Sequence, residues 1–442
     1  MVGTVLHMIS YAEALALVHA HVAPLASEWV ASADAEGRVL ADALSSQAEL
    51  PPFDNSAMDG FALATAGRGA LADREYVVSG TVAAGQDAGA AAIGAAWEIM
   101  TGAGVPPGAD AVVPIEQVQI LEHDGERPSR IRLRQPVRAG QHIRRRGEDV
   151  RLHDRVIDAG TMLRGAHLML LAGLGCAHVQ VVRRPRVALI ATGRELIGDP
   201  AQPLQPGQIR DGTSSYLLAQ LRAAGADVVW RGQVGDDDAA FDASLAQARH
   251  AGADLILSTG AVSRGRYDFI PEALARHAAE VLFHKVAVRP GKPVLLARFS
   301  DGALYMGLPG NPMASAAGLR FFVEPALRGL LGMPVEHGVR VALEAPMQAR
   351  PIWRQHLRAR LLCSAAGALS VQILPQQESF RVAPLLQANV WAVLEPQDEG
   401  AAASTHAQVF GLGHLHPAAP AIALPGKPMN MPVGAAHPGA VA

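Results

Sequence analysis

Aspartates follow two predicted strands in the central part of the chain, at positions where carboxylates can hold a divalent cation. Asp236 comes after the apolar segment 227–234, and Asp268 comes after a glycine-containing loop. Helix capping is the plainer interpretation, since Asp side chains accept hydrogen bonds from first-turn N–H groups. Helix capping readily explains one aspartate of the run 236–238, but it explains the presence of three less well. Because Mg²⁺ takes few carboxylates and completes its shell with phosphate oxygens, the two positions together allow a Mg²⁺ site.

Two loops rich in glycine and hydroxyl side chains follow predicted strands of the same region. They are ATGRELIG (191–198), which is also a candidate helix start, and STGAVSRG (258–265). Backbone N–H groups at helix starts bind oxyanions, and glycine lets a ligand approach the backbone. One such turn is more often only a helix cap. Two of them in one sheet favour a ligand that carries a phosphate or a pterin.

A basic turn and a Gly-Asn-Pro turn lie further along the chain. The turn 284–293 places Lys285, Arg289 and Lys292 around Pro-Gly, which suits anion neutralisation. A solvated basic turn is an equally good interpretation. GLPGNPMAS (307–315) leads into a predicted helix and is a candidate anion-binding start, although short turns of this kind are common.

Two polar motifs lie in the first third of the chain. PPFDNSAMDGFAL (51–63) contains Asp54, Asn55, Ser56 and Asp59, and we favour a functional role because so many ligating side chains are unusual at an apolar boundary. RRRGEDV (144–150) is, by composition alone, more simply a surface turn held by ion pairs.

The elements that must position these residues form several domains. Ser10 and Glu13 fit a capping box at the start of a helix over 10–22, and a short helix is expected over 36–44. Strand and helix patterns alternate over 184–332, which indicates a doubly wound α/β domain with ligands at the carboxyl ends of its strands. The predicted class is multidomain α/β and β, with this organisation: a helical or dimerisation region at 1–50 with 150–183, an inserted β module at 51–149, the α/β domain at 184–332, a C-terminal β-barrel or sandwich at 334–411, and a disordered tail at 412–442.

Composition excludes several classes of protein. The net charge is −3, so no basic field recruits nucleic acid. The two cysteines, Cys176 and Cys363, have no spacing typical of a zinc site or a disulfide framework. We see no secretory signal and no apolar stretch long enough to span a membrane. A cytoplasmic enzyme is therefore expected.

Taken together, the motifs resemble the molybdopterin molybdenumtransferase family, which includes the C-terminal part of gephyrin. The resemblance runs from about residue 9 to 411. It depends on motifs in the same order: PPFDNSAMDGFAL, IMTGAGVPPGADAVVPIE (99–116), IRRRGEDV (143–150), ATGREL, GQIRD (207–211), TGAVSRGRYD (259–268), KVAVRPGKP (285–293) and GLPGNP (307–312).

The resemblance implies a homodimer that inserts molybdate into adenylylated molybdopterin, releases AMP and uses Mg²⁺. The active cleft would lie between the α/β domain of one subunit and the β module of the other. The adenylyltransferase that makes the substrate and recipient molybdoenzymes are possible further partners. The implied catalytic residues are Asp59, Asp149, Asp236, Asp268 and Lys285, of which Asp236 and Asp268 hold the metal. The implied substrate-binding residues are Thr101, Glu195, Ser263, Arg289, Pro309, Pro312 and Arg358.

Several positions depart from the family pattern. Ala261 replaces a common Gly and Thr213 a common Asn, and Arg289 stands where Lys is frequent. At positions where the family has serines this chain has Ala314, Ala383 and Pro384, and the segment around Arg358 is atypical. The missing hydroxyls leave a non-catalytic molybdopterin-binding scaffold or a diverged paralogue as the alternative. Adenylyl transfer, the preceding step, is a third hypothesis, which the β modules and the DNSAMDG motif oppose.

Overall fold

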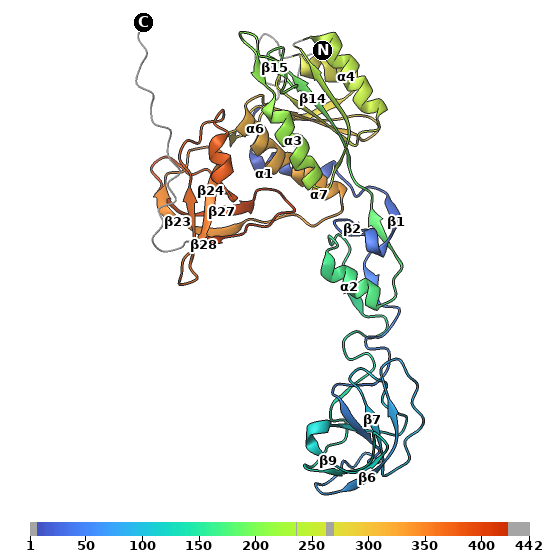
Figure 1. Ribbon diagram of the computed structural model, residues 1–442. Helices are drawn as coiled ribbons and strands as arrows, with labels where there is room; N and C mark the ends of the chain where they lie inside the picture. Colours follow the sequence, from blue (N-terminus) through green and yellow to red (C-terminus); the bar gives the residue numbers. More distant parts are fainter. Residues whose placement is uncertain (1–6, 236, 262–268, 423–442) are drawn as a thin grey trace. The chain divides into compact units, whose positions relative to one another are not determined.

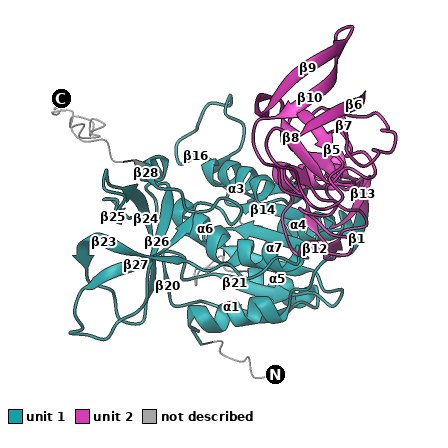
Figure 2. Ribbon diagram, turned by 90° about the horizontal axis from the view of Figure 1, so that it is seen from below, with its two compact units in different colours: residues 1–28, 182–442 teal, residues 29–181 magenta. Residues whose placement is uncertain are grey.

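The computed structural model describes residues 7–235, 237–261 and 269–422 (Figure 1). The chain divides into two compact units (Figure 2): unit 1 comprises residues 1–28 and 182–442, and unit 2 comprises residues 29–181. Within the described residues, no helix is both long and apolar enough to cross a membrane.

Unit 1 contains a mixed six-stranded sheet. Its strands, in spatial order, are β17 (Asp227–Val234), β14 (Arg186–Thr192), β18 (Leu255–Thr259), β22 (Leu304–Leu308), β21 (Leu295–Arg298) and β19 (Glu280–His284). The first four strands are parallel, and the last two pair antiparallel at the edge. β18 and β22 are buried along their whole length, as expected for central strands covered on both faces.

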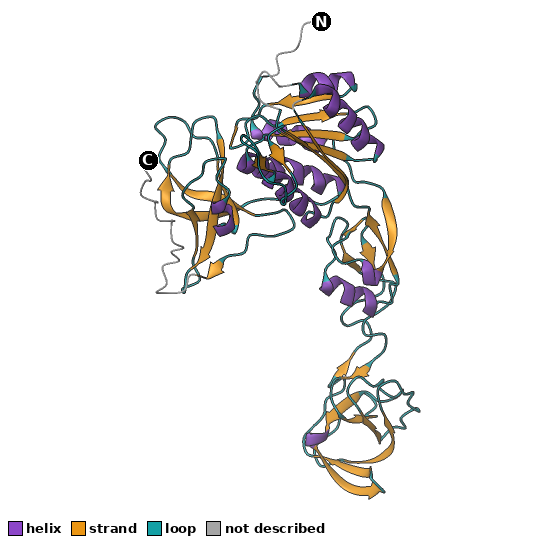
Figure 3. Ribbon diagram, turned by 45° about the horizontal axis from the view of Figure 1, so that its top comes forward, coloured by secondary structure: helices purple, strands orange, loops and turns teal. Residues whose placement is uncertain are grey.

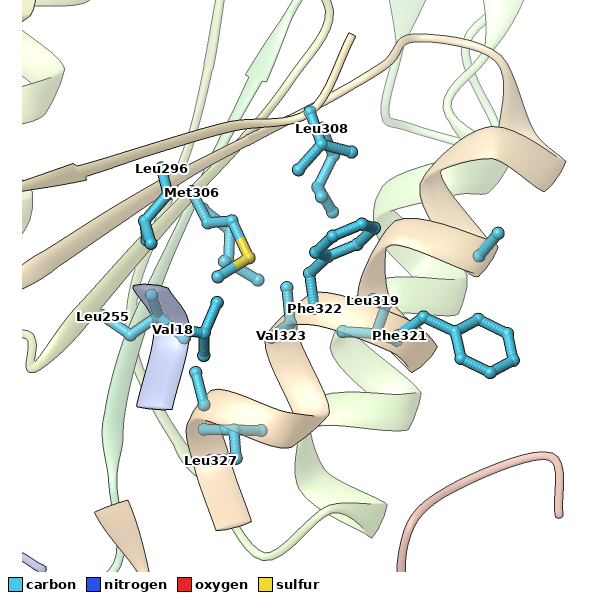
Figure 4. Close-up of a cluster of buried hydrophobic side chains, with 14 of the residues drawn as sticks. Val18, Leu255, Leu296, Met306, Leu308, Leu319, Phe321, Phe322, Val323 and Leu327 are labelled. Carbon is cyan, nitrogen blue, oxygen red and sulfur yellow. The ribbon is translucent and has the colours of Figure 1, made fainter. Parts of the chain in front are cut away.

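Helices cover both faces of this sheet (Figure 3). Successive residues of a strand point to opposite faces, so Leu189 and Leu257 join one core while Ile190 and Ile256 join the other. The first core, part of which Figure 4 shows, is closed by α1 (Tyr11–Ala20), α3 (Gly212–Ala223), α6 (Pro312–Gly318), a π-helical turn (Leu319–Val323) and α7 (Glu324–Leu330). The second is closed by α4 (Asp238–His250) and α5 (Ile270–Arg276). The doubly wound arrangement is confirmed.

The C-terminal part of unit 1 is a closed five-stranded barrel. Pairing runs from strand to strand and returns to the first, in the order β24 (Arg354–Cys363), β25 (Leu369–Ile373), β23 (Val339–Met347), β27 (Ser404–Gly411) and β26 (Val390–Leu394). The short strands β20 (Val288–Arg289) and β28 (Ala421–Ile422) add to β24 from outside the ring, and a 3₁₀ helix spans Ala383–Gln387. Of the barrel and the sandwich that the sequence left open, the structure has the barrel.

Part of the expected disordered tail is folded. His414 is buried, its N–H donates to a carboxylate oxygen of Glu324 at 2.8 Å, and the amide of Asn389 donates to the carbonyl of Ala419 at 3.0 Å. The expectation of disorder from residue 412 onward is therefore wrong for 412–422, where long-range hydrogen bonds override a Pro- and Ala-rich composition. Residues 423–442 lie outside the described part.

Unit 2 is built mainly of strands. Its six-stranded sheet runs in the order β8 (Ala111–Pro114), β5 (Gly60–Leu63), β7 (Ala95–Ile99), β6 (Glu75–Val82), β10 (Arg127–Leu133) and β9 (Val118–Asp124). Two short antiparallel pairs follow, β4 (Asn55–Ser56) with β11 (Ile143–Arg144) and β3 (Leu44–Ser45) with β12 (Arg155–Ile157). The remaining elements are α2 (Gly165–Gly173), the 3₁₀ turns Ser32–Asp34 and Ile115–Gln117, and the strands β1 (Ser27–Ala31), β13 (His178–Val182) and β2 (Val39–Leu40).

The segment before β4 differs from the expectation in two respects. Residues 36–44, expected as a helix, contain β2 and the start of β3, because Gly37 has a φ of +71° and the Leu40 N–H donates to the carbonyl of Thr161 at 2.9 Å. The first helix, α1, belongs to unit 1, where Ala14 and Val18 are fully buried in the first core of the sheet. It is therefore not part of a helical region formed by 1–50 with 150–183.

Candidate active site

Three parallel strands of unit 1 end side by side. Their register brings Thr259, the last residue of β18, opposite Leu308 of β22, and the Thr192 hydroxyl at the end of β14 donates to the carbonyl of Thr259 at 2.7 Å. Gly260 follows with a φ of +84°, and a Cβ there would lie 2.5 Å from the Thr192 hydroxyl oxygen. Only glycine fits this position without displacing its neighbours. The backbones at the ends of these strands therefore approach one another closely.

A cavity of about 700 Å³, which we call the sheet cavity, opens at this edge. Its polar wall contains Glu195, Thr213 and Asn311, and its other wall comes from the barrel segment 380–385. The ATGRELIG loop that contributes Glu195 forms the short strand β15 (Leu196–Ile197), paired with β16 (Ile209–Arg210), and does not open a helix as expected. Glu195 is exposed, and its carboxylate lies close enough to Gly193 that a Cβ there would be 2.8 Å from it.

A second cavity of about 630 Å³, the turn cavity, lies beside the first and shares Asn311 with it. The turn 289–293 contributes the exposed cations Arg289 and Lys292, and Arg350 adds a third cation from the segment before β24. The Lys292 ammonium lies 5.4 Å from the centroid of the Trp353 ring, so an aromatic face helps to hold it in place. Glu378 also lines the cavity and pairs with Arg381 at 3.2 Å, so cations outnumber carboxylates in the lining, which suits a small oxyanion.

The start of α6 separates the two cavities. Pro312 is its first residue and lines the sheet cavity, whereas Pro309 and Ala314 line the turn cavity. The hydroxyl of Ser315, which the sequence placed next to the missing serine at 314, is buried and donates to the carbonyl of Pro309. It therefore makes a structural hydrogen bond within the turn.

Arg358 is only 2% exposed and lies outside the described linings of both cavities. Its guanidinium donates to the carbonyls of Gln376 at 2.7 Å and of Arg381, and burial lowers its pKa. The side chain thus fixes the segment 376–381. This segment presents Ser379 to the turn cavity. Sequence reasoning missed Ser379, although it is a hydroxyl residue just before the RVAPLLQAN segment.

In unit 2 the structure brings Asp59 and Thr101 together. The Asp59 carboxylate accepts hydrogen bonds from the Thr101 N–H at 2.6 Å and from its hydroxyl at 2.9 Å. These bonds favour the ionised form and lower the pKa of the exposed Asp59. Asp149 is also exposed, and its N–H donates to the carbonyl of Leu50 at 2.9 Å.

The ion-pair interpretation of RRRGEDV holds for two of its arginines. Arg145 pairs with Asp54 at 2.6 Å, and Arg146 pairs with Glu49. Asp54, which the sequence offered as a ligating residue, also accepts the Arg146 N–H at 2.8 Å and is therefore committed to holding this turn.

Three predicted site residues, Asp236, Ser263 and Asp268, lie outside the described residues. Beside the first, Asp237 caps α4 by accepting the Ala240 N–H at 2.7 Å. Lys285 is half-buried with a φ of +79°, and its N–H donates to the carbonyl of Val294 at 3.0 Å. Across the described parts of the chain, no group of three or more His, Cys, Asp or Glu side chains is arranged to hold a metal ion.

Comparisons with known proteins agree with this architecture. Residues 9–175 match the family model of the MoeA N-terminal region (domain I and II), and residues 188–329 match that of a probable molybdopterin binding domain. A molybdopterin molybdenumtransferase of Synechococcus elongatus is 36% identical over 420 residues, covering 92% of this chain and 100% of the relative. One from Bacillus subtilis is 35% identical over 393 residues, covering 87% and 89%.

A solved structure gives the same result. The molybdopterin biosynthesis MoeA protein of Pyrococcus horikoshii OT3 superposes with a TM-score of 0.76 at 26% identity, covering 91% of this chain and 99% of that one. The resemblance inferred from the motifs is thus confirmed, together with the multidomain fold. The chain therefore belongs to the molybdopterin molybdenumtransferase family, as a transferase of molybdenum cofactor biosynthesis.

Proposed function

We propose that the chain inserts molybdate into adenylylated molybdopterin and releases AMP. The observation that carries this proposal is the pair of adjoining cavities, one at the strand ends and one lined by cations, which share Asn311. The sheet cavity has the size and mixed polarity for the pterin or the nucleotide part of the substrate. The turn cavity is suited to molybdate, so the two reactants would meet at the start of α6.

The proposed chemistry requires positioning and charge neutralisation more than covalent help from the protein. An oxygen of water attacks the phosphoanhydride bond between molybdopterin and AMP, so that AMP leaves and molybdopterin keeps its own phosphate. The two dithiolene sulfurs bind molybdenum in place of one molybdate oxygen, which leaves as water with the two thiol protons, and the oxidation state of molybdenum does not change. Arg289 and Lys292 bind the molybdate oxyanion, and Lys285 is retained as a proposed catalytic cation. Pro309 and Pro312 shape the two cavities, and Glu195 binds substrate in the sheet cavity. We assign Arg358 a positioning role for the wall that contains Ser379.

A Mg²⁺ requirement is part of the proposal. Asp236 and Asp268 would hold the ion, and Ser263 would bind substrate. In the sequence the two aspartates follow β17 and β18, which flank β14 and end at the same edge of the sheet as the Glu195 loop. A set of oxygen donors at a phosphate-binding edge fits Mg²⁺ chemistry. When bound, the ion supplies positive charge to the phosphate oxygens.

We further propose a cytoplasmic homodimer, in which the unit 2 residues serve the active cleft of the other subunit. The bonded pair of Asp59 and Thr101 supports a functional site there, since an exposed, ionised carboxylate held by two donors is preorganised to bind a cation. Asp149 is proposed as a second carboxylate of this site. The adenylyltransferase that makes the substrate and the molybdoenzymes that receive the product are the proposed partners.

The test is the release of AMP from adenylylated molybdopterin with Mg²⁺, with and without molybdate. We expect molybdate to trigger AMP release and the pterin to gain molybdenum. Lys292→Ala should raise the molybdate concentration needed, whereas Arg127→Ala, which removes an exposed cation of unit 2, should leave it unchanged. Tight substrate binding without either product would refute the insertion reaction and favour a molybdopterin-binding scaffold. Ala314 would then be the first position to revert to serine.

A further inference from the structure

The barrel side of the sheet cavity is apolar. It consists of Phe380, Val382 and Leu385, whereas the rest of the lining mixes polar side chains, glycine backbone and further apolar side chains such as Met313. Phe380 is 63% exposed and Val382 49% exposed. An aromatic side chain left in water at the lip of a cavity gains about 25 cal/mol for each Å² that a ligand covers. This wall therefore favours a ligand with a flat apolar face.

The Phe380 ring is presented by a fixed segment of backbone. The carbonyl of Ser379 accepts the Met313 N–H from α6 at 2.9 Å, and Arg358 donates to carbonyls before and after Phe380 in the sequence, at Gln376 and Arg381. The backbone that carries the ring is therefore held by both the α/β layer and the barrel. Because this backbone has little freedom left to lose, the position of Phe380 along the cavity is preorganised for a ligand.

The Arg381 guanidinium lies over the Phe380 ring, and the cavity lining also contains the glycines Gly260 and Gly310. The Arg381 guanidinium lies over the Phe380 ring at 5.3 Å from its centroid. Phe380 is 63% exposed and lines the cavity, so much of its side chain remains accessible to a ligand. Across the cavity, Gly260 and Gly310 have no side chains, and a Cβ on Gly310 would touch the Gly260 Cα at 3.6 Å. A planar ring can therefore lie against backbone on that side.

We propose that Phe380 stacks on the planar nitrogen heteroaromatic ring of the substrate and positions it in the sheet cavity. The proposal rests on the proposed function, which supplies two such rings, the pterin and the adenine. Both have the same stacking chemistry, since each presents a flat π-face. Val382 and Leu385 of the same segment also line the cavity, so the surroundings of the Phe380 ring offer apolar contact to such a ring.

The experiment measures the affinity of the full-length protein for two probes, AMP and molybdopterin. Phe380→Ala, Phe380→Leu and Phe380→Trp are compared with Leu386→Ala, a change at a neighbouring side chain that is 88% exposed and lies outside the described lining of the cavity. We expect Phe380→Ala and Phe380→Leu to weaken one probe about tenfold, within the range for aromatic residues that stack on bases. Phe380→Trp should restore binding, and Leu386→Ala should leave it unchanged.

Indole fluorescence of Phe380→Trp gives a reading that an ordinary apolar contact would not change. The stacked probe, molybdopterin or AMP, should quench the additional emission of this variant relative to the wild type, whereas the other probe should not. Loss of AMP binding alone assigns the ring to adenine instead. The inference is overturned if the leucine variant binds both probes like wild type, or if the wild type binds neither. Molybdate-dependent AMP release in the wild type is measured separately. The insertion reaction can therefore be refuted while the stacking inference holds, and the stacking inference can be refuted while the insertion reaction holds.

Discussion

Replacing Arg320 with methionine should destabilise the contact between the α/β layer and the barrel. The side chain is 1% exposed, donates to the carbonyl of Gly411 at 2.9 Å, and pairs with Glu324 at 3.3 Å and with Glu336 at 2.6 Å. Methionine keeps much of the apolar volume but removes the charge. A buried carboxylate left without its partner typically costs about 3–5 kcal/mol of folding free energy. Because Glu324 can take up a proton when its partner is removed, we expect a loss at the lower end of this range at a pH where it is ionised beside Arg320.

The loss of folding free energy caused by Arg320→Met should depend on pH. Burial raises the pKa of Glu324 from 4.5 to about 8, against the attraction of Arg320. The folded state therefore holds a proton that the unfolded state has released, and stability falls as pH rises from about 4.5 to about 8. Without Arg320 that pKa rises further. At about pH 6 the carboxyl is neutral in either protein, so the substitution should cost less there than at about pH 9.

Calorimetric unfolding at the two pH values measures the difference. For a domain of 150–250 residues 1 kcal/mol moves the midpoint by about 2–4 °C, so a loss of about 3 kcal/mol at about pH 9 corresponds to roughly 6–12 °C. The control is Arg249→Met, which breaks a partly exposed pair with Asp301 at 2.8 Å and should cost no more than about 1 kcal/mol. An equal loss at both pH values, or a loss no larger than that of the control, would refute the reasoning.

Three further changes test single features. Gly260→Ala should destabilise unit 1 by about 1–2 kcal/mol in thermal unfolding and reduce substrate binding, because a Cβ would lie 2.5 Å from the Thr192 hydroxyl oxygen at a φ of +84°. Thr101→Val should let the pKa of Asp59 return toward its ordinary value, which an NMR titration of the carboxyl would detect. Ser10→Ala should cost about 1 kcal/mol in thermal unfolding by removing the N-cap of α1, whereas Ser10→Asp should retain most of the stability.

The strands and helices of the α/β layer could be predicted because the sequence pattern within each segment is enough to identify it. Apolar runs such as 186–192 and 255–259 are long enough to be buried strands, and the helices between them have helical spacing. The failures occur where distant partners decide. Residues 36–44 become strands through bonds to the segment 161–163, and 412–422 is held by groups such as Glu324. Composition and periodicity within either segment contain no sign of those partners.

The same distinction applies within the site. Asp59 and Thr101 lie 42 positions apart, yet each stands in its own dense motif, so both were found, although their mutual hydrogen bonds were not foreseen. The family resemblance implied Arg358 as a substrate-binding residue. In the structure its guanidinium donates to backbone carbonyls of the segment 376–381 and lies outside the described linings of both cavities. A residue that matches a family motif shows which part of the chain forms the site. Which of its atoms face the ligand depends on the contacts that surround it in the structure.

The departures from the family pattern change the kind of force that would hold molybdate. Ala314 lines the turn cavity without a hydroxyl, and the Ser315 hydroxyl is bonded to the Pro309 carbonyl, which leaves Ser379 as a described hydroxyl residue of the lining. Arg289 and Lys292 remain exposed there. Oxyanion binding would therefore depend more on charge than on neutral donors. Attraction between exposed charges is screened over about 8 Å at physiological ionic strength. Molybdate affinity in this chain should accordingly weaken with added salt more steeply than in relatives that keep the serine at this position.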